Sequence, residues 1–351
     1  MIEDLKFFRD KKILVTGHTG FIGSWLIKVL SVLGADLCGF SLPPPTIPNM
    51  FDLIKDRLSL RNVIGDIRDS RLLKQTIDDF QPEIVIHLAA QPIVLESFEN
   101  PLETFQINVT GTVNLLNELR SSNSVVKSII VFTSDKSYHN NEWVYPYREI
   151  DPLGGKDPYS ASKSCQDIVV NSFRESYFQD LGIGISAVRA GNVIGGGDWA
   201  KYRIIPDTVR AFSNNQPVML RNPNAVRPWQ HVMEPISGIL MLAEKMYWNI
   251  KFSDAWNFGP DTSSSKTVKE VVETFIKLYG SGNYETEESI VGNESSYLQI
   301  DSSKARKMLK WSPHYDFEQA VNATVEWYKK YLEKDNMDEL TERQIREFIE
   351  E

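Results

Sequence analysis

The chain has very few cysteines, the residues that form disulfides in secreted proteins and that often bind metal ions. Only two of its 351 residues are cysteines, Cys38 and Cys165, and they lie far apart in apolar surroundings. This usage indicates unpaired thiols in a reducing compartment. The cysteines do not have the spacing of a metal site, so we expect no bound metal.

Long apolar runs and basic clusters are also missing. No apolar stretch has the length of a membrane span, and residues 1–6 do not have the pattern of a signal peptide. The net charge of −9 and the lack of a basic run argue against a nucleic-acid partner. We therefore expect a cytoplasmic protein that binds neither a membrane nor nucleic acid.

The composition itself, with 42% apolar and 24% charged residues, is ordinary for a globular protein. Short apolar strands alternate with helical patterns up to about residue 190, which predicts a Rossmann-type, doubly wound parallel sheet of the α/β class. We expect residues 1–192, completed by about 232–262, to form an NAD-binding domain. The remaining residues, 193–231 and 263–351, should form a smaller mixed α/β substrate lobe.

The pattern is less regular in the second half. Helices are expected near residues 268–279 and 317–332, and residues 221–231 and 280–296 are expected to be loops. The acidic tail after Glu333 is expected to be helical but only marginally stable.

The clearest motif is a glycine-rich turn. The apolar run 12–16 has the character of a buried strand, and a helical pattern begins near Phe21. Gly17, Gly20 and Gly23 lie between and just inside these elements, where a tight turn and a close approach to a pyrophosphate need residues without side chains. The helix N-terminus then offers N–H groups to the anion, so the stretch predicts dinucleotide binding.

Other strand ends extend the predicted cofactor site. Asp66 follows a strand and could accept a hydrogen bond from the adenine amino group, and Ala89-Ala90-Gln91 leaves room at the end of another strand. The second strand ends without the acidic residue that holds a ribose in many NAD-binding folds. Since no arginine replaces it, the choice between NAD and NADP stays open but favours NAD. His87, inside a strand, is interpreted as structural.

Two further stretches carry reactive side chains. Thr133, Ser134, Asp135 and Lys136 follow the buried strand 128–132, and polar groups are costly there unless they face a site. Tyr159 and Lys163 are four residues apart, which places them on one helical face. An ammonium beside a phenol favours the phenolate, so tyrosine could act as a base near neutral pH.

Arginines mark the predicted substrate site. Arg221 and Arg227 lie in predicted loops, and Arg189 and Arg203 precede them. Guanidinium groups pair with phosphates in two-pronged geometry. Together the four arginines predict a diphosphate site.

These motifs resemble the extended short-chain dehydrogenase/reductase superfamily over nearly the whole chain, and within it the CDP-glucose 4,6-dehydratases. The narrower resemblance rests on the long stretches Arg189 to Trp199 and Arg227 to His231, together with Thr16 to Phe21, Leu42 to Thr46 and Asp157 to Ser160. It implies a tightly held NAD, a nucleotide-diphosphate hexose as substrate, and a homodimer or dimer of dimers.

The resemblance also implies roles. Tyr159 would be the base at C4, Lys163 its partner, and Ser134 would hold the C4 oxygen. Asp135 would be the acid at C6, and Lys136 is a candidate base at C5. Substrate would contact Asn192, Arg203, Arg221 and Arg227. The cofactor is assigned to Gly17, Thr19, Gly20, Phe21, Ile22, Gly23, Asp66, Ile67, Ala89, Ala90, Gln91, Tyr159 and Lys163.

Three alternatives remain open at this point. The chain could be a dehydratase for another nucleotide hexose, a C4 epimerase or reductase of nucleotide sugars, or a non-catalytic NAD(P)-binding protein. An epimerase does not need the acid and the second polar group after the strand, so Asp135 and Lys136 favour the dehydratase.

Overall fold

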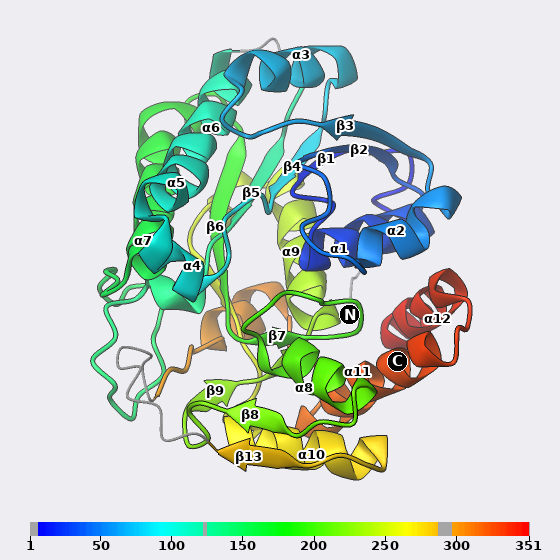
Figure 1. The fold of residues 1–351 in the computed structure, drawn as a ribbon. Coiled ribbons are helices and arrows are strands. Elements are labelled where there is room, and N and C mark those ends of the chain that lie inside the picture. The colour runs from blue at the N-terminus through cyan, green and yellow to red at the C-terminus, as the bar shows by residue number, and fades with distance from the viewer. Residues whose placement is uncertain (1–5, 122–124, 287–296, 351) are drawn as a thin grey trace.

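A seven-stranded sheet forms the centre of the molecule (Figure 1). The computed structural model describes residues 6–121, 125–286 and 297–350. The strand order is β11-β6-β5-β4-β1-β2-β3, and every neighbouring pair is parallel, which confirms the predicted fold class. The strands are β1 Lys12–Thr16, β2 Asp36–Ser41, β3 Leu60–Ile64, β4 Ile84–His87, β5 Ser128–Phe132, β6 Gly184–Ala190 and β11 Trp256–Phe258.

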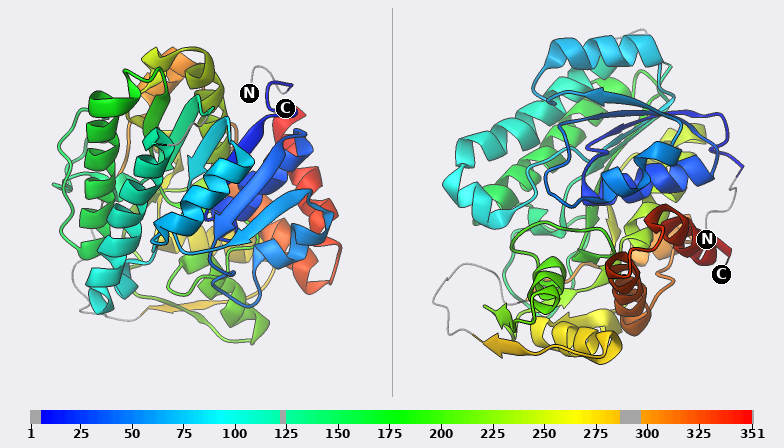
Figure 2. Two further views of the ribbon diagram at one scale, coloured as in Figure 1. Left: turned by 90° about the horizontal axis from the view of Figure 1, so that it is seen from above. Right: turned by 45° about the vertical axis from the view of Figure 1, so that its right-hand side comes forward.

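Helices cover both faces of this sheet (Figures 1 and 2). Because successive side chains of a strand point to opposite faces, Ile13 and Val15 of β1 enter one core and Leu14 the other. The first core includes residues of α1 and α9, and the second includes residues of α3, α6 and α7. These helices are α1 Phe21–Val32, α3 Ser70–Phe80, α6 Gly111–Ser121, α7 Pro158–Phe173 and α9 Met233–Trp248.

Local sequence explains where the helices begin and end. The side chain of Asp69 accepts a hydrogen bond from the Leu72 N–H at the start of α3, as expected of an N-terminal cap. Gly34 follows α1 with a φ of +79°, a conformation that glycine adopts without strain. Residues 101–121 are helical throughout, as α5 Pro101–Phe105, one π-helical turn and α6.

Short helices connect the main elements. They are α2 Met50–Ile54, α4 Val94–Glu99, the π-helical turns Gln106–Thr110, Arg174–Phe178 and Ala305–Leu309, and the 3₁₀ turns Lys55–Arg57, Asp135–Ser137, Ile250–Phe252 and Thr262–Ser264.

In the described part of the second half, three two-stranded sheets and the helices α8, α10 and α11 lie below the main sheet in Figure 1. β7 pairs with β10, β9 with β12, and β8 with β13. The elements are β7 Val193–Ile194, β8 Val218–Leu220, β9 Val226–Pro228, β10 Gln230–His231, β12 Ser265–Thr267, β13 Tyr284–Thr286, α8 Ile204–Ser213, α10 Val268–Tyr279 and α11 Phe317–Leu332.

Two predicted loops are therefore partly wrong. Residues 221–231 contain β9 and β10, and residues 280–296 contain β13, while 287–296 lie outside the described residues. These strands are two or three residues long, which is too short for an alternating pattern to show in the sequence. Their partners are also distant in the chain.

The C-terminal helix, α12 (Met337–Glu350), corrects a third expectation. It is helical as predicted but not marginal, since Leu340, Ile345 and Phe348 are buried in the first core. It contacts α1 and α2, and Figure 2 shows it beside them. The many acidic residues of the tail make its buried apolar positions hard to recognise in the sequence.

Both cysteines are free. Among the described residues, none of the helices has the length and apolar character needed to cross a membrane.

Candidate active site

The glycine-rich turn joins β1 to α1 at the carboxyl edge of the sheet. Gly17 has a φ of +76°, and a Cβ there would lie 2.6 Å from the Ala89 nitrogen. A Cβ on Gly23 would lie 2.1 Å from the Gly17 carbonyl oxygen. Glycine at both positions lets α1 start directly against the turn and the turn pack on the end of β4.

The N-terminus of α1 is open to an anion. Gly20 caps the helix without a side-chain hydrogen bond, the first turn holds no acidic residue, and the only close neighbour of a Cβ on Gly20 would be the Gly17 oxygen at 3.4 Å. The first N–H groups of a helix have no partner within it. These features fit a dinucleotide pyrophosphate. Phe21 and Ile22, on the first turn, are half-buried.

The end of β2 carries hydroxyl groups in place of an acid. The Thr19 hydroxyl donates to the Leu42 carbonyl oxygen at 2.8 Å, and its oxygen lies 2.8 Å from the Ser41 hydroxyl. Asp66 is already paired, since the Arg68 guanidinium lies 2.6 Å from one of its oxygens and hydrogen bonding from Arg68 lowers the pKa of the carboxyl. An adenine amino group would share Asp66 with Arg68. The neighbouring Ile67 is buried.

The loop after β4 is tied down by Asn108, which the sequence interpretation assigned no role. Its amide exchanges hydrogen bonds with the backbone of Gln91 and donates to the Ser162 hydroxyl at 2.8 Å. The Gln91 side chain donates to Thr104 at 2.9 Å. These contacts hold the half-buried Ala89 and Ala90 at the sheet edge. Asn108 lies in the π-helical turn between α5 and α6, and its polar side chain is fully buried there.

Ser134 and Asp135 lie directly after β5. The Ser134 oxygen accepts a hydrogen bond from the Lys136 N–H at 3.1 Å, and its hydroxyl donates to one Asp135 oxygen at 3.1 Å. The other Asp135 oxygen has no hydrogen-bond partner among the described residues. Burial raises the pKa of Asp135, against the charges of Lys136 and Arg227. The carboxyl is therefore suited to hold and release a proton. Thr133 points elsewhere and donates to the Val188 carbonyl oxygen.

Tyr159 is placed against Ser134 by the first turn of α7. Asp157 caps this helix by accepting from the Ser160 N–H, and the Tyr159 N–H donates to the Ser97 hydroxyl at 3.1 Å. Burial raises the pKa of the phenol to about 12, and a hydrogen bond to Ser134 opposes this rise.

Lys163 lies one turn further along α7. Its ammonium donates to the Gln166 side-chain oxygen at 2.9 Å and to the Phe132 carbonyl oxygen at 3.3 Å. Burial lowers its pKa to about 7, and Asp167 opposes this fall. Besides burial, the main influences on the Tyr159 pKa are Ser134, Asp135, Arg203 and Asp157, and the expected effect of Lys163 on the phenol stays a prediction.

Two of the predicted substrate arginines reach this centre electrostatically. The charge of Arg203 lowers the pKa of Tyr159, and that of Arg227 lowers the pKa of Asp135. Arg203 pairs with Asp198 at 2.9 Å, and Arg227 lies buried on β9. Asn192 is half-buried next to β7, and its carbonyl oxygen accepts from Gln230 at 3.1 Å.

The other two arginines differ. Arg221 is exposed, stacks 5.5 Å from the Tyr202 ring, and borders a hollow of ≈ 440 Å³ with Lys201 and Arg210. Arg189, which we counted toward the diphosphate site, is buried. It pairs with Asp167 at 2.8 Å and donates to the Tyr138 hydroxyl at 2.7 Å, so that interpretation was wrong. A charged side chain on a buried strand is shielded from water, so it needs a partner of opposite charge inside the protein.

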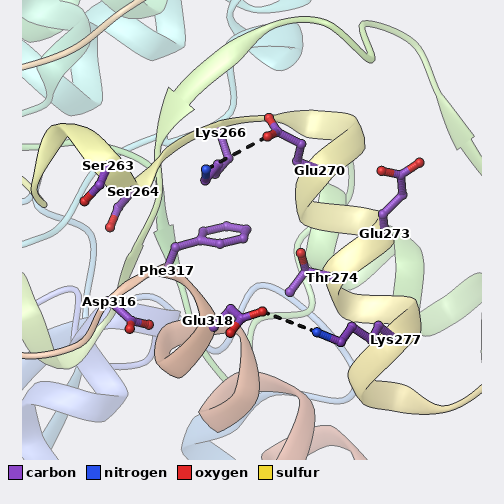
Figure 3. Close-up of a pocket in the computed structure, with 10 residues that line it drawn as sticks. All are labelled: Ser263, Ser264, Lys266, Glu270, Glu273, Thr274, Lys277, Asp316, Phe317 and Glu318. Carbon is purple, nitrogen blue, oxygen red and sulfur yellow. Dashed lines mark hydrogen bonds and ion pairs between the residues drawn. The ribbon is translucent and has the colours of Figure 1, made fainter.

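A second hollow, of ≈ 570 Å³, lies between α10 and the start of α11 (Figure 3). Four of its charged side chains form two pairs, Lys266 with Glu270 and Lys277 with Glu318. None of the predicted site residues lines it, so it is separate from the candidate active site.

A parallel sheet with a glycine-rich first turn, and with Tyr159 and Lys163 at its carboxyl edge, is the arrangement of the short-chain dehydrogenase/reductase superfamily. Within it, the chain belongs to the family described as GDP-mannose 4,6 dehydratase, whose model matches residues 14–324.

Named relatives of this family are similar along their whole length. The chain is 43% identical to CDP-glucose 4,6-dehydratase of Salmonella typhimurium, over 99% of this chain and 98% of the relative. It is 25% identical to dTDP-glucose 4,6-dehydratase of Xanthomonas campestris, over 90% and 92%.

Solved structures show the same fold. The dTDP-glucose 4,6-dehydratase of Bacillus anthracis, solved in complex with NAD, matches with a TM-score of 0.78 and 25% identity, over 93% of this chain and 98% of that one. A UDP-glucose 4-epimerase of Stenotrophomonas maltophila, at 20% identity, matches with a TM-score of 0.81 over 92% and 99%.

Proposed function

We propose that this chain is an NAD-dependent hydro-lyase that converts CDP-D-glucose to CDP-4-dehydro-6-deoxy-D-glucose. The observation that carries the reaction type is the buried carboxyl of Asp135 beside the Ser134–Tyr159 pair. It supplies an acid next to an oxidation site, which a simple epimerase does not need. The nucleotide and the sugar follow the name of the relative that is 43% identical.

The residues at the carboxyl edge fit NAD. The open N-terminus of α1 would hold the pyrophosphate, and Thr19, Asp66 and Ile67 would line the adenosine side. Tyr159 and Lys163 would face the nicotinamide side. Held there, the cofactor would supply the hydride chemistry, which is oxidation at C4 of the sugar and reduction at C6.

In the oxidation half of the cycle, Tyr159 takes the proton of the C4 hydroxyl. Ser134 holds the C4 oxygen, since its hydroxyl already meets the phenol. With a pKa of about 12 the phenol needs nearby positive charge to serve as a base. Arg203 provides such a charge, and Lys163, one turn along α7, would add to it.

In the elimination half, a ketone at C4 makes the C5 proton acidic. Lys136, as the neutral amine or through a water molecule, removes this proton. Asp135 protonates the C6 hydroxyl, which leaves as water. Burial raises the pKa of Asp135, which keeps its proton available at higher pH than in a free carboxyl.

Arginines and an amide would bind the substrate. Asn192 and Arg203 would face the sugar and phosphates, and Arg227 the diphosphate. Arg221, beside Tyr202 and Lys201, would lie toward the nucleotide.

A labelling experiment tests the proposal. The protein is incubated with NAD and with CDP-glucose that carries deuterium at C4. Loss of one water with deuterium recovered at C6 is expected, and product without this transfer would contradict the scheme. An epimerase would release no water, and a non-catalytic binding protein would give no product. GDP-, UDP- and dTDP-hexoses in parallel test the nucleotide.

The remaining proposals concern organisation. Residues 1–192, with about 232–262, would form the NAD-binding domain, and 193–231 with 263–351 the substrate lobe. Exposed apolar side chains on neighbouring helices support a homodimer or a dimer of dimers. Leu102 on α5 is 70% exposed and Ile168 on α7 is 57% exposed, and these helices contact each other. Free cysteines fit a cytoplasmic location.

A further inference from the structure

A buried chain of hydrogen bonds links Lys163 to the end of β1. The Gln166 oxygen accepts from the Lys163 ammonium at 2.9 Å, and the Gln166 amide donates to the Thr112 hydroxyl oxygen at 2.7 Å. That oxygen lies 3.0 Å from Nε2 of His87, whose Nδ1 lies 2.7 Å from the Thr16 hydroxyl. All five side chains are at most 3% exposed.

The direction of each hydrogen bond follows from counting protons. Thr112 donates its single hydroxyl proton to the Asn108 carbonyl oxygen at 2.7 Å, so it can only accept from Gln166 and His87. His87 therefore carries its proton on Nε2, and its Nδ1 accepts from Thr16. Burial lowers the pKa of His87 to about 3, which keeps the ring neutral.

The same count orients the Gln166 amide. Its NH₂ group faces Thr112, which leaves only its oxygen for the ammonium, and the ammonium is a donor without acceptor capacity. Lys163 is thus held by two neutral oxygens, those of Gln166 and Phe132. An ammonium has three donors, so within the described part of the chain one N–H is left for the phenol and the ligand.

We propose that Gln166, held in turn by Thr112 and His87, is the residue that positions the Lys163 ammonium and sets its charge state for the chemistry at Tyr159. The catalytic part of this inference rests on the proposed function. A neutral acceptor lets Lys163 lose its proton more easily than a carboxylate would, and the glutamine lies at i+3 on α7, where it faces Lys163. Burial lowers the Lys163 pKa to about 7, in agreement with an acceptor that carries no charge.

The test measures the Lys163 pKa directly, by NMR titration of the full chain labelled with ¹³C at lysine Cε and assigned with Lys163→Met. In Gln166→Glu the pKa should rise by about one unit or more, because a carboxylate would face the ammonium. In Gln166→Leu it should fall, since the charged form loses an acceptor. Gln179→Leu, at an exposed position, should leave it unchanged.

A second variant, at a residue that contacts Gln166 but not Lys163, keeps the test informative if substitutions at position 166 prevent folding. Thr112→Val frees the Gln166 amide without touching Lys163, and the pKa should move in the same direction as in Gln166→Leu. An unchanged Lys163 pKa in all the variants that fold would overturn the inference.

Kinetics separate this inference from the function. The pH at which kcat for 4-keto sugar formation is half-maximal should shift with the Lys163 pKa, while KM for the sugar stays nearly constant. A wild-type protein that forms no 4-keto sugar from any nucleotide hexose, but shows the pKa shifts, would remove the proposed function and leave the role of Gln166 in holding Lys163. An active wild-type enzyme without the shifts would remove that role.

Discussion

At the scale of single residues, burial favours the neutral forms of three ionisable groups of the site. It raises the pKa of Tyr159 to about 12, lowers that of Lys163 to about 7 and raises that of Asp135. Arg203 and Arg227 work against burial from the other half of the chain, because their charges favour the phenolate and the carboxylate. Proton transfer at this site therefore depends on both halves of the molecule.

Replacing Tyr159 tests the base. Tyr159→Phe should lower kcat by about 10²–10⁴-fold, since the proton acceptor is lost, while the ring and its packing remain. NAD affinity, measured by fluorescence titration, should change little. The matched control is Tyr177→Phe, a half-exposed tyrosine in the turn that follows α7. Equal activity of the two variants would contradict the assignment.

At the scale of elements, α12 is held on α1 by a buried ion pair. Lys28 of α1 donates to Asp338 at 2.8 Å, with 4% and 6% of the side chains exposed, and also pairs with Glu342. Lys28 lies on α1, the helix that begins at the glycine-rich turn. The ion pair therefore joins α12 to the helix whose N-terminus is predicted to bind the cofactor.

Breaking this pair should be costly. Lys28→Met leaves the buried Asp338 carboxylate without its main partner, so the free energy of unfolding should fall by about 3–5 kcal/mol. Lys74→Met removes one partner of an exposed pair on α3 and should change the free energy of unfolding far less, because water screens exposed charges. Urea titrations of the two variants measure the difference, and similar losses would refute the role of the buried pair.

Glu234 gives a second element-scale prediction. It lies buried on α9 and accepts hydrogen bonds from the N–H groups of His314 and Tyr315, which joins α9 to the loop before α11. Burial raises its pKa from 4.5 to about 7, with these N–H groups opposing the rise. The folded chain thus binds this proton more tightly than the unfolded chain.

The Glu234 contribution to stability is therefore full below about pH 4.5 and is lost as the pH rises to about 7. Glu234→Gln can still accept the two N–H groups but cannot ionise. Its stability relative to wild type should increase between about pH 5 and about pH 8, measured by urea unfolding at each pH. A difference that is the same at every pH would show that Glu234 does not titrate in this range.

At the scale of the whole molecule, the exposed apolar side chains of Leu102 on α5 and Ile168 on α7 predict association. Leu102→Glu and Ile168→Glu should convert a dimer into monomers, because a carboxylate cannot be buried in an apolar interface without a partner. Sedimentation velocity measures the change, with Met308→Glu, at another exposed apolar position, as control. Loss of the dimer in the control alone would point to another interface.

The sequence by itself was enough for the parallel sheet, the glycine-rich turn and the position of Tyr159 and Lys163 one turn apart on a single helix, since each depends on a local pattern of apolar residues, glycines or helical spacing. It also separated His87 from the catalytic groups, and the ring is indeed enclosed between Thr16 and Thr112. The family followed from the same motifs.

Only the tertiary structure decided what the charged residues touch. Arg189 pairs with Asp167, and Lys28 pairs with Asp338 of α12; both contacts join residues far apart in the chain. Lys163 donates to Gln166, which is a neighbour on the same helix. The short strands β9, β10 and β13 likewise form only because distant partners meet them. Local patterns follow from neighbours in the sequence, whereas the partner of a buried charge is determined by which elements the folded chain brings together.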